Sequence, residues 1–123
     1  MFDNFFQSTL NLMSFTFTNS VNQPVTADLK TDRYINDNLA ILVFETKPEE
    51  YDDGYYCNLT TNFGETLESP DMFYLDTNKT PADLINVLEK DELFTYTGRI
   101  RPSGFCNYPI CQLTEKGKAL LEL

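Results

Sequence analysis

Few residues in this chain have the type and spacing that catalysis requires. The chain has no histidine, which removes the usual base of Ser-His and Cys-His nucleophiles and every histidine-containing metal site. Its cysteines form no C-x-x-C pair, so neither a zinc ribbon nor a disulfide framework is indicated; they are Cys57, Cys106 and Cys111. The glycines stand too far apart to form a phosphate-binding loop. We therefore expect a protein that is not an enzyme and binds no cofactor or metal.

Glu45 and Lys47 form the one pattern that suggests catalysis. They follow an apolar run in the order E-x-K, as in nucleases where two carboxylates hold Mg²⁺ and a lysine steadies the attacking water. The second carboxylate would come from Asp28 or Asp32. Because so short a pattern is common, and because a strongly acidic nuclease would repel its substrate, a magnesium-dependent nuclease is the third hypothesis for function.

The acidic residues are concentrated in the middle of the chain. Of the formal net charge of −10, residues 45–76 contribute −8, from nine acids and one lysine. Such a surface repels nucleic acid and anionic membranes and attracts basic partners at low salt. We expect a protein partner with a basic surface, and no direct DNA binding. The candidate partner-binding residues are Glu45, Glu49, Glu50, Asp52, Asp53, Glu65, Glu68 and Asp71.

A simpler alternative is that the negative charge only keeps the protein in solution. No apolar run approaches the roughly 20 residues that span a bilayer, and the N-terminus lacks the pattern of a signal peptide. These features predict a cytoplasmic protein that makes no use of a membrane.

The apolar pattern predicts one α+β domain over residues 1–123, with a mainly antiparallel sheet of about five to six strands and one main helix packed on it. The run at 39–44 is apolar on both faces, which predicts a central strand. Residues 1–12 are expected to form a mobile or amphipathic lead, and 47–54 an exposed loop. Strands are expected over residues 13–18, 25–34, 39–44, 55–61, 93–101 and 105–113.

The sequence TPAD at residues 80–83 predicts the start of the helix. Thr80 would be the N-cap, Pro81 the first helical residue, and Asp83 the acid that completes a capping box. Thr114 is expected to cap a short final turn. The side chains expected to face the sheet are Leu84, Ile85 and Leu88.

Five short strings together resemble a known family. They are NLAI at 38–41, LTTN at 59–62, DTN at 76–78, TGR at 97–99 and SGFCNYP at 103–109. In this order they are similar to a family of small acidic proteins of unknown function, carried by plasmids, conjugative elements and prophages of Gram-positive gut and oral bacteria. The resemblance covers roughly residues 33–113 and implies a fold and a genetic setting, but no catalytic residue.

Within these strings the residues themselves indicate structural roles. Asp76 and Asn78 are expected to bond backbone groups ahead of the helix, and Gly98 and Gly104 to lie in turns.

The genetic setting implied by the resemblance suggests an inhibitor of host defence, such as a type II anti-CRISPR protein. The acidic segment would then act as a DNA mimic on the basic groove of Cas9 or of its complex with guide RNA. The second hypothesis is a non-enzymatic accessory or regulatory protein of a conjugative element, which binds an element-encoded protein and forms a homodimer.

Overall fold

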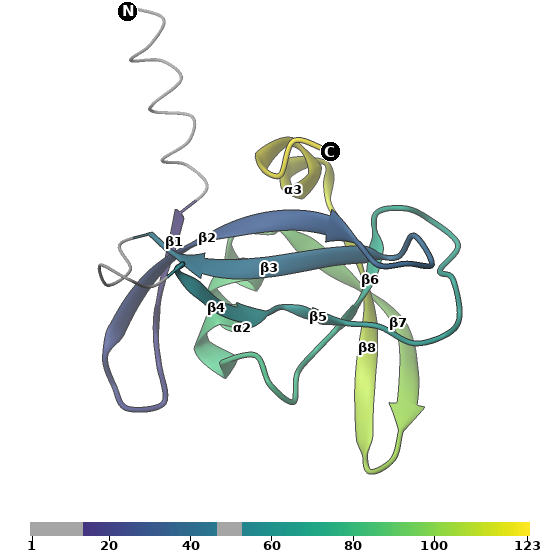
Figure 1. The fold of residues 1–123 in the computed structure, drawn as a ribbon, viewed down its shortest axis with the longest axis horizontal. Helices are drawn as coiled ribbons and strands as arrows, with labels where there is room; N and C mark the ends of the chain where they lie inside the picture. Colours follow the sequence, from purple (N-terminus) through teal and green to yellow (C-terminus); the bar gives the residue numbers. More distant parts are fainter. Residues whose placement is uncertain (1–13, 47–52) are drawn as a thin grey trace, which may run out of the picture.

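Two antiparallel sheets of four strands each make up most of the structure, a computed structural model that describes residues 14–46 and 53–123 (Figure 1). The strand orders are β1-β2-β3-β4 and β5-β6-β8-β7. The α+β class is confirmed, although the strands form two sheets of four where one sheet of five to six was expected. The elements are β1 (Ser14–Thr18), β2 (Pro24–Arg33), β3 (Leu39–Glu45), β4 (Tyr55–Asn58), β5 (Thr60–Thr61), β6 (Met72–Leu75), α2 (Ala82–Lys90), β7 (Phe94–Ser103), β8 (Cys106–Leu113) and α3 (Glu115–Leu120).

The expected lead at 1–12 lies outside the described residues, as does most of the loop expected at 47–54. Among the helices that the structure does describe, none has the length and apolar character needed to cross a membrane.

A single bent segment joins the two sheets. β4 and β5 are separated only by Leu59, whose N–H donates to the Ile41 carbonyl and whose carbonyl accepts from the Asp76 N–H, both at 2.9 Å. Leu59 is completely buried. The one strand predicted over 55–61 therefore pairs with β3 in the first sheet and then with β6 in the second.

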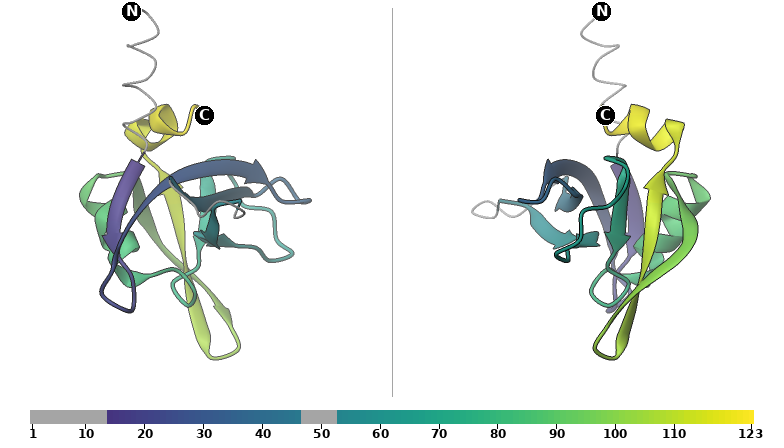
Figure 2. Two further views of the ribbon diagram at one scale, coloured as in Figure 1. Left: turned by 60° about the vertical axis from the view of Figure 1, so that its left-hand side comes forward. Right: turned by 90° about the vertical axis from the view of Figure 1, so that its right-hand side faces the viewer.

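The main hydrophobic core lies inside the bend of the two sheets. Alternate residues of β2 and β3 point into it, as the period of a strand requires, and α2 lies against β1 and β7 (Figure 2). The predicted apolar stripe of this helix is confirmed, because Leu84, Ile85 and Leu88 are its buried residues. Each fully buried side chain of this size contributes roughly 1.5–3 kcal/mol to the free energy of unfolding.

The start of α2 differs from the prediction. The helix begins at Ala82, with Pro81 as N-cap and no capping side chain. The Thr80 hydroxyl instead donates to the carbonyl of Asn58 at 3.2 Å, and Asp83 accepts the N–H of Thr18 at 2.7 Å. Both side chains tie the helix to neighbouring strands, so tertiary contacts displaced the local capping box.

The β7–β8 hairpin is longer than predicted. Residues 102 and 103, expected in the connection, continue β7 and pair with Asn107 and Cys106. The turn is formed by Gly104, with a φ of 60°, and Phe105. Pro102 is tolerated because β7 is an edge strand and loses no ladder hydrogen bond there.

The C-terminal turn depends on a close backbone approach. Thr114 caps α3 as predicted, because its hydroxyl oxygen accepts the N–H of Gly117 at 2.9 Å. A Cβ atom added to Gly117 would lie 2.1 Å from the carbonyl oxygen of Leu93. Only glycine fits this contact without a shift of the backbone.

We expect Gly117→Ala to lower the free energy of unfolding by about 2–3 kcal/mol, because the added methyl group must displace backbone atoms. The loss should appear in urea unfolding even though alanine is the better helix former. Gly64→Ala is the matched control, since its added Cβ would meet nothing within 4 Å. Equal effects of the two substitutions would contradict the close approach at Gly117.

Candidate functional site

The five candidate carboxylates that the structure describes do not form one group. Glu45 ends β3 and Asp53 precedes β4, whereas three others lie in the connection from β5 to β6. That connection contacts the start of β3, where the Asn38 side chain donates to the Glu65 carbonyl at 2.8 Å. β3 is about 20 Å long, so the two groups lie near its opposite ends. Glu49, Glu50 and Asp52 lie outside the described residues.

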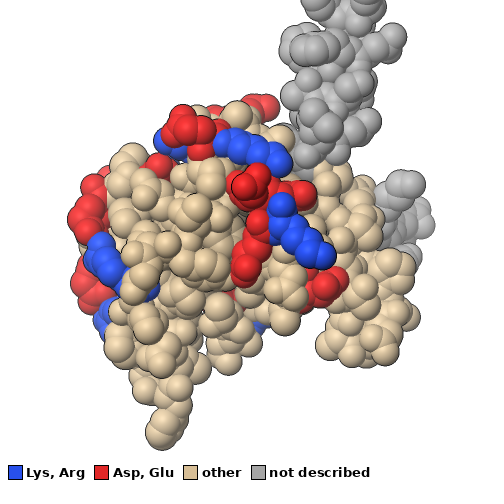
Figure 3. All heavy atoms as spheres, turned by 180° about the vertical axis from the view of Figure 1, so that it is seen from behind, with Lys and Arg blue, Asp and Glu red and all other residues tan. Residues whose placement is uncertain are grey.

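Acidic and basic side chains also alternate on the surface. On the face shown in Figure 3, red carboxylate groups occur in several separate places with blue basic groups between them. The described surface on this face therefore carries no single continuous block of negative charge.

A bulge in β7 brings two arginines to the connection between β5 and β6, here called the 62–71 loop. The register of β7 against β8 shifts between residues 96 and 100. Gly98 lies in this bulge, where a turn was expected, and its φ of 88° falls in the left-handed region that favours glycine. Arg99 and Arg101 follow directly.

These arginines pair with two of the candidate carboxylates. Arg99 Nη1 lies 2.5 Å from Glu68 Oε2. Arg101 binds both carboxylate oxygens of Glu65 at 2.9 Å, in a bidentate arrangement. The hydrogen bonds from the arginines hold the pKa of Glu65 and of Glu68 below the ordinary value. Both carboxylates are thus neutralised within the chain.

Asp71, the third candidate in this loop, is also paired. Its carboxylate lies 3.3 Å from Lys118 Nζ and accepts hydrogen bonds from the side chains of Gln112 and Ser69. Burial alone would raise the pKa of Asp71, but these hydrogen bonds outweigh it, so the pKa lies below the ordinary value.

Asparagines fix the backbone of the 62–71 loop. The Asn38 side chain is 3% exposed, and its NH₂ group donates to Asn62 Oδ1 at 2.9 Å and to the Glu65 carbonyl at 2.8 Å. Its oxygen accepts the N–H of Leu67 at 2.8 Å. The Asn36 side chain donates to the Phe63 carbonyl at 2.9 Å. A buried amide with three partners specifies one loop conformation.

Aromatic packing completes the attachment of the loop. The Phe63 ring lies 5.0 Å from that of Tyr74 and 5.3 Å from that of Tyr108, and the Arg101 guanidinium lies 4.5 Å above it. Beneath the loop is a second, smaller core made of Leu67, Met72, Tyr74 and Ile110.

Four of the five strings that carry the family resemblance therefore meet around this loop, through Asn38, Asn62, Arg99 and Tyr108. Asp76 has the predicted role, since its carboxylate accepts the N–H groups of Asn78 and Lys79 at 3.1 and 3.0 Å. The sequence analysis did not predict that Arg99 and Arg101 pair with acids of the 62–71 loop. The signal was present in the charge count, because residues 93–123 hold two arginines and two lysines against two acids.

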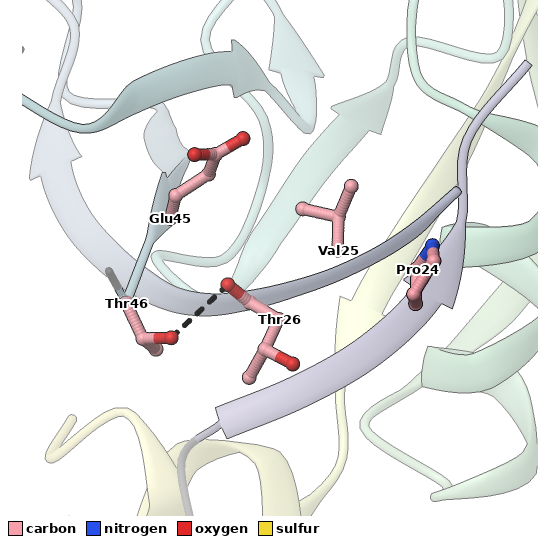
Figure 4. Close-up of a pocket in the computed structure, with 5 residues that line it drawn as sticks. All are labelled: Pro24, Val25, Thr26, Glu45 and Thr46. Atoms are coloured by element: carbon pink, nitrogen blue, oxygen red, sulfur yellow. Dashed lines mark hydrogen bonds between the residues drawn. The ribbon is translucent and has the colours of Figure 1, made fainter. Parts of the chain in front are cut away.

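Glu45 lies at an open groove at the other end of β3 (Figure 4). Its carboxylate projects from the same face of the sheet as Val25, while the Thr46 hydroxyl donates to the Thr26 carbonyl at 3.2 Å. Within the described residues, neither Glu45 nor Asp53 forms an ion pair. The groove has a volume of about 350 Å³ and is lined by Pro24, Val25, Thr26, Glu45 and Thr46.

The acids considered for a magnesium site do not meet Glu45. In the β2–β3 register, Asp28 pairs with Phe44 and Asp32 with Ala40. Since neighbouring residues of a strand project to opposite faces, both acids lie on the face opposite Glu45. Lys47 lies outside the described residues, and the described ones contain no cluster of three potential metal ligands among Cys, Asp and Glu.

Two of the cysteines are poor nucleophiles. All three are free thiols in the structure. Burial raises the pKa of Cys57 to about 11 and that of Cys111 to about 12, so neither is appreciably ionised near neutral pH.

Comparison with known proteins identifies a family. The family model described as "Domain of unknown function (DUF4313)" matches residues 28–119, which include the range 33–113 of the expected resemblance. No curated protein and no solved structure matches the chain.

Asn38→Ala should lower the free energy of unfolding by about 2–3 kcal/mol, because the Leu67 N–H and the Glu65 carbonyl lose their buried partner. Thermal or urea unfolding measures the change. Asn107→Ala removes the same side chain from an exposed strand position and should change stability by no more than about 0.5 kcal/mol. A loss no larger for Asn38 than for Asn107 would show that the amide does not hold the loop.

Proposed function

We propose that this chain, which belongs to the DUF4313 family, is a non-enzymatic inhibitor that binds a basic nucleic-acid site of a host defence nuclease. The observation that supports this most directly is the unpaired acidic end of the first sheet, at the junction of β3 and β4. Residues 45–53 hold five acids and one lysine, a net −4. Glu45 and Asp53 flank this segment and form no ion pair with any described residue.

The 62–71 loop takes no part in this docking surface. Its three acids contribute −3, and they pair with Arg99, Arg101 and Lys118, the last of which Asp71 shares with Glu115. A partner would have to break these pairs before it could use the carboxylates. The candidate surface therefore narrows to Glu45, Glu49, Glu50, Asp52 and Asp53.

The partner that fits such a surface is a site built to bind phosphates. Carboxylates on one face of a strand recur every ~6.7 Å, whereas a duplex carries one negative charge per ~1.7 Å of its axis. Matching a duplex requires a second row of charge from a neighbouring segment. Cas9, or Cas9 with its guide RNA, has an arginine-rich groove of this kind. If the gene lies on a mobile element, the inhibitor would be made in cells whose defence nucleases attack that element.

A second candidate function is an accessory protein of a conjugative element. Exposed apolar side chains on the β7–β8 hairpin favour it, because an inhibitor that acts through charge alone has no need of them. These include Ile100 and Phe105, which are 57% and 109% exposed.

The experiment is inhibition of plasmid cleavage by Cas9 and guide RNA in the presence of a molar excess of this protein. We expect inhibition by the wild type and at least a tenfold loss of potency in the double variant E49K/D52K. The variant D32K/D91K is the matched control, because it changes the net charge equally at two exposed acids far from the junction in sequence. It should retain potency.

Raising the salt concentration should weaken the inhibition, since the docking is electrostatic. Unimpaired cleavage at large excess would reject the Cas9 version of the proposal. Equal losses of inhibitory potency in the two double variants would reject the assigned surface. Such a result would mean that inhibition depends on the total charge of the protein.

A further inference from the structure

The β7–β8 hairpin projects beyond the rest of the described structure (Figures 1 and 2). Residues 93–114 contain no Asp or Glu, in a chain with a net charge of −10. In the space-filling view the end of the hairpin is the protrusion at the lower left, which shows neither acidic nor basic groups (Figure 3). The most prominent part of the molecule is thus also free of acidic residues.

One face of this hairpin is mostly apolar, and most of it is exposed within the part of the chain that the structure describes. Along β8, Pro109 lies on the same face as Cys111 and Leu113, because alternate residues share a face. Cys111 and Leu113 belong to the main core, whereas Pro109 pairs with Ile100, which is 57% exposed. The core-facing side of the hairpin therefore continues past the end of the core and becomes open. We call this surface the open face; it consists of Ile100, Pro102, Pro109, the polar Asn107 that pairs with Pro102 and, at the turn, Phe105.

Phe105 makes this surface unusual. It is 109% exposed, at the tip of a two-residue turn held by strands on both sides. A fully exposed aromatic ring on a rigid support is the kind of anchor that dominates binding energy in protein interfaces.

The open face is better suited to side-chain packing than to strand addition. β7 is an edge strand, but the bulge at residues 97–99 distorts its free edge and Pro102 lacks an N–H group. Both features hinder the pairing of another strand along this edge.

We propose that the open face binds the open face of a second copy of the chain and forms a symmetric dimer. Two chains of charge −10 repel each other, and the acid-free hairpin lets them meet without bringing carboxylates together. Arg99 and Arg101 do not oppose this contact, since both are paired with glutamates of their own chain. In a twofold arrangement, Phe105 of each copy covers Ile100 and Pro109 of the other.

Ile35 is as exposed as Phe105 but does not suit a symmetric contact. It is 106% exposed at the β2–β3 turn, but Asp32 and Asp37 flank it in the sequence. A symmetric contact at Ile35 would place these carboxylates opposite their copies, which is unfavourable. Ile35 is therefore the matched control for Phe105.

The test is sedimentation equilibrium of the full chain from roughly 1 to 300 μM, since an interface of this small size should bind in the micromolar range. A thiol reductant in the buffer prevents a disulfide between copies through Cys106. We expect a monomer–dimer equilibrium for the wild type. Association should weaken at least tenfold in Phe105→Ser and in Ile100→Ser, and remain unchanged in Ile35→Ser. Circular dichroism verifies that each variant is folded.

Salt separates this proposal from the proposed function. Raising NaCl from 50 to 500 mM should strengthen the dimer by screening the repulsion between acidic chains, whereas it should weaken docking to a basic partner. The proposal would be overturned if the wild type stays monomeric at 300 μM. This includes a wild type that binds other proteins through the open face but does not bind itself. So would an equal loss of association in Ile35→Ser and Phe105→Ser. Neither result bears on the inhibition of cleavage.

Discussion

The pairing of Arg99 and Arg101 with Glu68 and Glu65 is the interaction on which the rest of this structure depends. These ion pairs hold the 62–71 loop against the outer face of the second sheet, where Asn38 fixes its backbone. Exposed ion pairs contribute little to stability individually. Here their main effect is on the conformation of the loop, because the bidentate contact of Arg101 and the buried amide of Asn38 together select one loop position.

With the loop in that position, the described surface has a neutralised acidic region, an unpaired acidic region and an exposed apolar region. The loop acids are matched by basic side chains. Among the described candidate acids, Glu45 and Asp53, at the other end of β3, are the ones that form no ion pair with a described residue. The acid-free hairpin projects separately and carries exposed apolar side chains. A charged partner and an apolar partner could therefore occupy different places on the molecule, and their affinities would respond to salt with opposite signs.

The sequence predicted the fold class, most strands and the buried stripe of α2, because these follow from the period of apolar residues. It could not show the change of sheet at Leu59, since the alternation of side chains continues through a bend. The capping box at Thr80 and Asp83 was wrong because both side chains bond residues distant in sequence. Candidate acids were recognised by type, but Arg99 lies 31 residues from Glu68 and Arg101 lies 36 residues from Glu65, so the pairing depends on the fold and not on a local pattern.

The most direct test of this account is an NMR titration of the side-chain carboxyl carbons of Glu65 and Glu68. If the arginines hold these carboxylates, both pKa values lie below the ordinary value for glutamate, about 4.3 in model peptides. Substitution of Arg101 by Gln should raise the pKa of Glu65 while that of Glu68 stays low. Ordinary pKa values for both glutamates in the wild type would mean that the carboxylates are free, and would contradict the structural role assigned to them.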